Sequence, residues 1–234
     1  QFISFFSAFH GRTLGALSLT GSKIIQKKGF YPLIPGVVHV PYANCFRCPY
    51  HLEYPSCELY CLNYIEEMLF LKTVDPDDVA AIFVEPIQGE GGYIVPPVQF
   101  IQGLRRICDQ YGILLVMDEV QSGMGRTGKM FASEYFKVQP DIICLAKGIA
   151  SGMPLGAIIA PAKIMNWKYG SHASTFGGNP VSCAASNATI DLLRGGLMAN
   201  ARTTGRWIKK QLKTFVDKYD IVGDVRGIGL MIGL

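Results

Sequence analysis

The sequence has no long apolar run, no charge-rich tract and no internal repeat. No uninterrupted apolar stretch approaches the roughly 18 residues that a membrane-spanning helix requires. Charged residues make up only 17% of the chain, and the net charge of +4 is not gathered into Lys or Arg runs, which argues against nucleic acid as a partner. The apolar start, 1–6, lacks the basic lead and the cleavage site of a signal peptide. We therefore expect a globular, cytoplasmic protein.

The chain is long enough for one large domain or two small ones. It has 234 residues, of which 49% are hydrophobic, so a substantial buried core is expected. The sequence does not begin with Met, and it ends within an apolar, strand-like stretch at 227–234. Both ends resemble interruptions of ordered structure, so we expect a fragment of a longer protein.

Four of the seven cysteines lie close together in the sequence. They form a Cys-x-x-Cys pair followed by a Cys-x-x-x-Cys pair, and this spacing is not a usual zinc motif. A zinc site, one or two disulfides, and reduced loop thiols therefore remain three alternatives, and we assign no metal ligand. The four residues are Cys45, Cys48, Cys57 and Cys61.

The middle of the chain alternates between short apolar runs and amphipathic stretches. Such alternation is typical of βαβ units, and it predicts an α/β fold with a mostly parallel sheet and helices on both faces. The expected strands are 79–84, 113–117, 142–145 and 155–160, and the expected helices are 100–111 and 131–136.

Flanking segments give less regular patterns. Residues 1–9 predict a strand, 10–13 a turn into a short helix that ends near 19, and 22–56 a long loop. Helical spacing of apolar residues also predicts three further helices, and a new sheet is expected to begin near 221. These helices are 58–72, 180–194 and 197–219.

Three ionisable residues each follow a predicted strand. Glu85, Asp118 and Lys147 come directly after apolar runs, and parallel sheets bind ligands at the carboxyl ends of their strands. A carboxylate beside a lysine is the pair of charges that pyridoxal phosphate (PLP) requires. The lysine forms a Schiff base, and the acid keeps the ring nitrogen protonated. A lone Asp118 could simply cap a turn, but Gln121 and the glycine-rich loop 123–128 accompany it.

Lys147 is expected to lie buried beside its strand end. An ammonium group there is costly unless it is paired or neutralised, and a covalent link to an aldehyde removes that cost. The glycines that follow, such as Gly148, would let a bulky cofactor approach the backbone.

Five motifs stand in order along the chain, namely AFHGRT at 8–13, EPIQGEGG at 85–92, DEVQSGMGRTG at 118–128, AKG at 146–148 and STFGGNP at 174–180. Together they resemble the class III, fold type I PLP-dependent aminotransferases, most closely the 4-aminobutyrate aminotransferase-like group. The resemblance covers essentially the whole chain. It implies a PLP-binding large domain at 1–218, without its N-terminal part, and a truncated start of a C-terminal small α+β domain at 219–234.

The resemblance also implies roles for the residues around the cofactor. Lys147 would form the Schiff base and, once displaced by substrate, shuttle the proton between the substrate carbon and C4′ of the cofactor, while Asp118 would pair with the pyridinium nitrogen. Gln121 would hydrogen-bond the ring hydroxyl. Glu85 would sit beside the cofactor and orient Gln121, with a purely structural hydrogen bond as the alternative.

Further implied contacts cover the ring and reach a second subunit. Val120 would pack against one face of the cofactor ring, and Phe9 would cover the other. Thr175 would reach across an interface to the phosphate of the partner's cofactor, so a homodimer is expected. A glycine- and serine-rich phosphate loop would precede residue 1.

Two charged residues bear on the substrate. By resemblance, Arg12 would bind the distal carboxylate of an ω-amino acid, a task suited to its planar fork, although local turn packing is an alternative. Glu90 resembles the glutamate that pairs with an arginine located beyond residue 234 when 4-aminobutyrate-type substrates are bound.

The leading hypothesis is transamination of an ω-amino acid such as 4-aminobutyrate, with 2-oxoglutarate as the amino acceptor. An amino-acid racemase or epimerase, and an ornithine or acetylornithine aminotransferase, are alternatives within the same family. A non-catalytic scaffold is the alternative from another class, but a scaffold has no need for a lysine opposite an acid.

Overall fold

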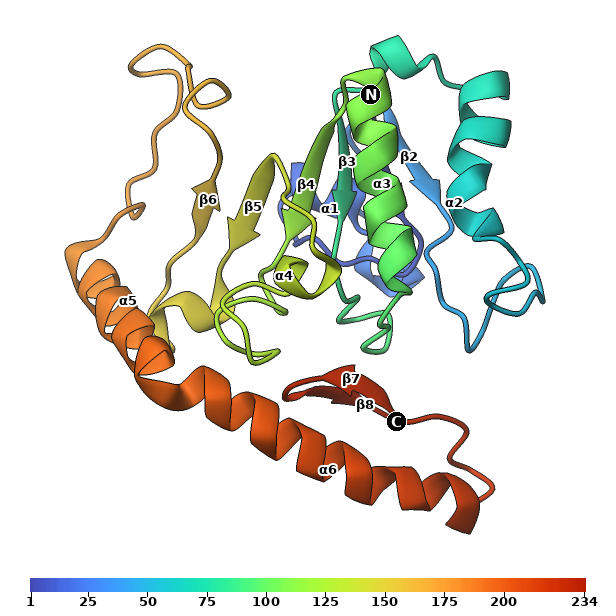
Figure 1. The fold of residues 1–234 in the computed structure, drawn as a ribbon. Helices are drawn as coiled ribbons and strands as arrows, with labels where there is room; N and C mark the ends of the chain where they lie inside the picture. The colour runs from blue at the N-terminus through green and yellow to red at the C-terminus, as the bar shows by residue number, and fades with distance from the viewer.

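The computed structural model describes residues 1–234, and its centre is a six-stranded sheet (Figure 1). The strand order is β2-β1-β3-β4-β5-β6; the first five strands are parallel, and β6 runs antiparallel to β5. The mostly parallel sheet is thus confirmed. The strands are β1 (Phe2–Phe5), β2 (Val37–Val40), β3 (Ala81–Val84), β4 (Leu114–Asp118), β5 (Ile142–Leu145) and β6 (Ala157–Ile159).

Six α-helices and several short 3₁₀- or π-helical segments connect the strands. The segment expected to be one helix at 58–72 is α2 followed by the wider π-helical turns of Ile65–Phe70. No helix is both long and apolar enough to cross a membrane. The α-helices are α1 (Leu14–Leu19), α2 (Tyr60–Tyr64), α3 (Val98–Tyr111), α4 (Ser133–Phe136), α5 (Pro180–Leu192) and α6 (Met198–Lys218).

The main core lies between the sheet and the helices in front of it, α2 and α3 (Figure 1). Helical spacing places Phe100, Leu104 and Ile107 of α3 on one buried face. Burying each such side chain stabilises the fold by about 1.5–3 kcal/mol. Gly103 on α3 lets α2 approach closely, because a Cβ there would lie 2.1 Å from a terminal methyl group of Leu62 in α2 and that side chain would have to shift.

One strand was missed by the sequence pattern. The predicted loop 22–56 contains β2, which pairs in parallel with β1 so that Phe2 faces Val37 and Phe5 faces Val40. Strand β2 is only four residues long and lies at the sheet edge. Its formation depends on hydrogen bonds to a distant segment, which local periodicity does not report.

The cysteine cluster lies in the same stretch of chain. Cys45, Cys48, Cys57 and Cys61 all line one cavity of about 20 Å³, and all are free thiols. No group of three His, Cys, Asp or Glu side chains is placed to hold a metal ion. In the structure no sulfur–sulfur bond joins these four residues.

A separate two-stranded sheet follows α6, as expected beyond residue 221. Its strands are β7 (Arg226–Ile228) and β8 (Met231–Gly233), and Figure 1 shows this hairpin between α6 and the lower edge of the large sheet. The hairpin contacts the loop after β4, since Leu230 N donates to Arg126 O at 3.0 Å. It therefore faces the edge at which the strands β3, β4 and β5 end.

Candidate active site

Glu85, Asp118 and Lys147 lie at the carboxyl ends of three adjacent strands, β3, β4 and β5. A cavity of about 80 Å³ opens there, and all three residues line it. The structure thus brings together seven of the nine predicted site residues, although Arg12 and Thr175 are not among the lining residues. The complete lining is Phe9, His10, Gly11, Glu85, Glu90, Asp118, Val120, Gln121 and Lys147.

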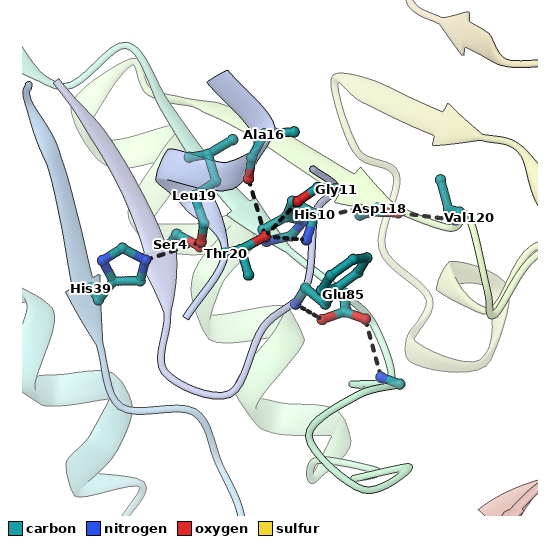
Figure 2. Close-up of polar contacts among 12 residues, drawn as sticks. Ser4, His10, Gly11, Ala16, Leu19, Thr20, His39, Glu85, Asp118 and Val120 are labelled. Carbon is teal, nitrogen blue, oxygen red and sulfur yellow. Dashed lines mark hydrogen bonds and ion pairs between the residues drawn. The ribbon is translucent and has the colours of Figure 1, made fainter. Parts of the chain in front are cut away.

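The Asp118 carboxylate is held by two hydrogen bonds. Oδ1 accepts from the backbone N–H of Val120 at 3.0 Å, and Oδ2 lies 2.8 Å from His10 Nδ1 (Figure 2). The bond to Val120 N is the turn cap that a lone aspartate would make after a strand. It uses only Oδ1, so Oδ2 is free to bind His10. Each oxygen can still accept another donor.

The sequence pattern places His10 only in a turn. Its side chain is 4% exposed, and 108 residues separate it from Asp118, so no local spacing could have predicted the pair. The one available signal was its place beside Phe9 in the motif at 8–13. His10 Nε2 is buried and has no hydrogen-bond partner.

Glu85 is buried and makes two hydrogen bonds to backbone amides. Oε2 accepts from Phe9 N at 2.9 Å, and Oε1 accepts from Gly89 N at 3.0 Å (Figure 2). Burial raises the pKa of Glu85 to about 7, although His10 and the two amides oppose the shift. These bonds match the structural alternative for Glu85, since no hydrogen bond joins it to Gln121.

Gln121 carries an acceptor that the protein leaves unused. Its Oε1 is buried without a hydrogen-bond partner, which is uncommon in folded proteins. Gly89 packs closely against this amide, because a Cβ at Gly89 would lie 2.2 Å from Oε1. The loop after β3 therefore sets the space available to Gln121.

Lys147 is exposed, so the expectation that it is buried beside the strand end was wrong. Strand β5 ends at Leu145, and Lys147, at φ 42°, begins the 3₁₀ helix Lys147–Ala150. That turn buries Ile149 and Ala150 and leaves Lys147 at the open cavity. Its amine is therefore available to a ligand in the cavity.

The substrate candidates lie toward the surface. The guanidinium of Arg12 is exposed and stands 5.4 Å from the centre of the Phe9 ring. Glu90 lines the cavity, and its Oε2 lies 3.1 Å from Lys23 Nζ. Thr175 is exposed in the loop between β6 and α5, and its predicted contact with a second subunit stays a prediction.

A second cavity of about 320 Å³ adjoins the first, and Glu90 and Gln121 line both. Its outer wall comes from the hairpin, through Arg226 and residues of β8. The two cavities therefore share a wall that Glu90 and Gln121 form.

Comparison with known proteins agrees with this arrangement. The family model Aminotransferase class-III matches residues 1–234. The chain is 47% identical over 238 residues to an alanine/serine racemase of Pyrococcus horikoshii, covering 99% of this chain and 50% of that protein. It is 43% identical over 236 residues to an acetylornithine aminotransferase of Methanopyrus kandleri, covering 100% and 54%.

A solved structure gives the same fold. The PLP-bound amine transaminase from an uncultivated Pseudomonas species matches with a TM-score of 0.91 at 35% identity, covering 98% of this chain and 53% of that one. This match confirms the predicted architecture of a fold type I PLP-dependent enzyme. The chain spans about half the length of the curated relatives it matches. It belongs to the class III aminotransferase family, and this membership implies pyridoxal phosphate as its cofactor.

Proposed function

We propose that the full-length protein is a PLP-dependent aminotransferase that moves the amino group of an ω-amino acid such as 4-aminobutyrate to 2-oxoglutarate. The observation that carries the proposal is the placement of Asp118 and Lys147 at the ends of adjacent strands, in one cavity. An acetylornithine aminotransferase among the relatives and an amine transaminase among the structures support it.

The residues of the cavity fit the cofactor. Gln121 Oε1 is a buried acceptor without a donor, which suits a ring hydroxyl, and Asp118 is a buried carboxylate with room for one more donor. Phe9 and Val120 supply aromatic and aliphatic surface in the same cavity. We assign these four residues and Lys147 to cofactor binding.

When bound, pyridoxal phosphate supplies an aldehyde for Schiff-base formation and a ring that stabilises negative charge on the substrate carbon. The protein would supply a negative charge beside the ring nitrogen and a base that moves the proton. Asp118, fixed by His10, presents a negative charge to the ring nitrogen. Lys147 Nζ would take the proton from the amino-bearing carbon and deliver it to the carbon of the cofactor that carries the aldehyde, and Phe9 and Val120 would exclude water from the ring faces.

Charged groups at the cavity mouth support a substrate with a carboxylate. Arg12 and Lys23 are cations near this mouth, and Glu90 is the anion paired with Lys23. We propose that Arg12 binds the distal carboxylate of the ω-amino acid. Glu90 would stay paired with Lys23 until a dicarboxylate substrate takes the place of the Glu90 carboxylate.

Racemisation is the second candidate function, and the 47% identity to an alanine/serine racemase favours it. Both reactions begin with proton transfer from the substrate carbon to Lys147. They differ in where the proton returns. A racemase returns it to the same carbon from the opposite face, and no keto acid is consumed.

The test is an amino-donor panel on the full-length protein, with 2-oxoglutarate present or absent and D and L products resolved. We expect glutamate to form from 4-aminobutyrate or another ω-amino acid. Inversion of an amino acid without any keto acid, and no glutamate, would replace the proposal by the racemase. Lys147→Ala should lower either activity by on the order of 10⁴-fold, whereas Lys72→Ala, which removes an exposed lysine outside the site, should not.

We also propose a homodimer in which Thr175 contacts the partner's cofactor phosphate, with 1–218 as the PLP-binding domain and 219–234 as the start of the next. The exposure of Thr175 outside its own cavity supports this arrangement. Mixed dimers of Lys147→Ala and Thr175→Ala chains would then hold one intact site. Activity recovered on mixing supports the shared site, and its absence in verified mixed dimers contradicts it.

A further inference from the structure

We propose that Arg226 is a positioning residue for the active site, which acts from β7 by fixing the loop 85–92. Arg226 Nε and Nη2 both donate to the backbone oxygen of Gly92, at 2.9 and 2.6 Å, across 134 residues of sequence. Asp224 Oδ2 lies 3.3 Å from Arg226 Nη1 and orients the guanidinium. The inference rests on the proposed function, because Glu90 and Gln121 matter only if the cavities bind cofactor and substrate.

Hydrogen bonds within the loop close residues 88–94 into a turn, so its residues are expected to move together. Gly92 N and Tyr93 N both donate to Gly89 O, at 3.0 and 3.2 Å, and Gln88 and Ile94 bond to each other on either side. Glu90 lies inside this turn. A restraint on Gly92 O therefore also restrains Glu90.

Among the contacts that hold the turn, there is one hydrogen-bonded anchor near each end. The buried Glu85 carboxylate accepts from Gly89 N at 3.0 Å, and Arg226 donates to Gly92 O. The first anchor comes from the strand end that carries the site. The second comes from the hairpin, through the two bonds of Arg226 to Gly92 O.

Movement of the turn would change both cavities. Glu90 lines the cofactor cavity and the adjoining one, and the tight contact of Gly89 with Gln121 fixes the orphan acceptor Oε1. Arg226 also lines the second cavity, and three of its five guanidinium N–H groups are used in bonds to Gly92 O and Asp224. The two bonds to Gly92 O are the contacts by which it would position the turn.

The competing explanation is that Arg226 only holds the hairpin in place. A variant of Lys209 distinguishes the two explanations. Lys209 Nζ donates to Gly227 O at 2.7 Å, so it ties the same hairpin to α6 without touching the loop 85–92. Lys209→Met is therefore a matched control. It weakens hairpin docking and leaves the bond to Gly92 intact.

The experiment compares Arg226→Gln, Arg226→Lys and Lys209→Met in the full-length enzyme. Hydrogen exchange of a peptide covering 88–94 reports the turn directly, and KM and kcat report the site. We expect Arg226→Gln to speed exchange at 88–94 and to raise KM about tenfold with a smaller change in kcat, as for a lost charged hydrogen bond. Arg226→Lys should recover part of both effects, and Lys209→Met should cause neither.

Unchanged exchange at 88–94 in Arg226→Gln overturns the inference, as does an equal effect of Lys209→Met. If Arg226→Gln does not fold, the same comparison is made with Arg226→Lys, which keeps the charge on a single donor nitrogen. Failure of the proposed function is a different result. The wild-type enzyme would then turn over no amino donor, while hydrogen exchange would still show whether Arg226 holds the turn.

Discussion

His10 Nδ1 lies 2.8 Å from Asp118 Oδ2, and this bond joins the segment after β1 to the end of β4. The two strands are not neighbours, because β3 lies between them. The acid that we assign to the cofactor nitrogen is therefore held by a residue from another part of the sheet edge. Its position depends on that partner.

Replacing His10 tests this dependence. His10→Phe leaves Asp118 Oδ2 without its donor, and loss of a hydrogen bond to a charged group should weaken cofactor affinity about 10- to 100-fold. His10→Asn, which can place an amide N–H near the position of Nδ1, should recover part of the affinity. Cofactor titration by absorbance measures the effect, with His51→Asn at an exposed position as the control. Equal cofactor affinity in His10→Phe and wild type would contradict a role of His10 in cofactor binding.

Glu85 predicts a pH dependence of stability. Burial raises its pKa from the ordinary 4.5 to about 7, so between these values the folded protein holds a proton that the unfolded chain has released. Raising the pH through this window should lower the free energy of unfolding, by on the order of 3 kcal/mol in total. Glu85→Gln removes the titration and should flatten the profile measured by denaturant unfolding from pH 5 to 8. Parallel profiles for the two proteins would contradict the assignment.

Gly89→Ala tests the contact with Gln121. The new Cβ would lie 2.2 Å from Gln121 Oε1, so the amide or the turn must move. We expect a loss of about 1–3 kcal/mol in stability from overpacking, together with weaker cofactor binding. Gly195→Ala is the matched control, because a Cβ there meets no atom within 4 Å. Cofactor affinity that is equal in the two variants would argue against a role for this contact.

Lys23→Met tests the ion pair with Glu90. Both side chains are about half exposed, so the free energy of unfolding should change by less than about 1 kcal/mol. Without Lys23, Glu90 would repel a substrate carboxylate, and KM for 2-oxoglutarate should rise about two- to fivefold while KM for a monocarboxylate keto acid stays constant. Lys28→Met, at a nearby exposed position, should change neither KM. A uniform change for both keto acids would show that the pair does not discriminate between them.

Much of the sheet was predictable because each strand carries its own pattern. The run 142–145 matches β5, and the predicted helix 180–194 contains α5. The edge strand β2 was missed, because its four residues become a strand only through pairing with β1.

The site was predictable where its residues follow strand ends. The parallel order of β3, β4 and β5 brings Glu85, Asp118 and Lys147 to one edge. The burial of Lys147 was predicted wrongly, since exposure depends on the packing of the turn that follows β5 rather than on the strand itself.

From the amino-acid sequence alone we could predict the alternation of strands and helices, and the acid and the lysine that follow two of the apolar runs. These features depend on residue periodicity, which acts over a few residues. Only the tertiary structure decided that His10 holds Asp118 and that Arg226 holds Gly92 O, across 108 and 134 residues. The physical reason is that a hydrogen bond forms where the folded chain brings donor and acceptor together, and no local pattern records that distance.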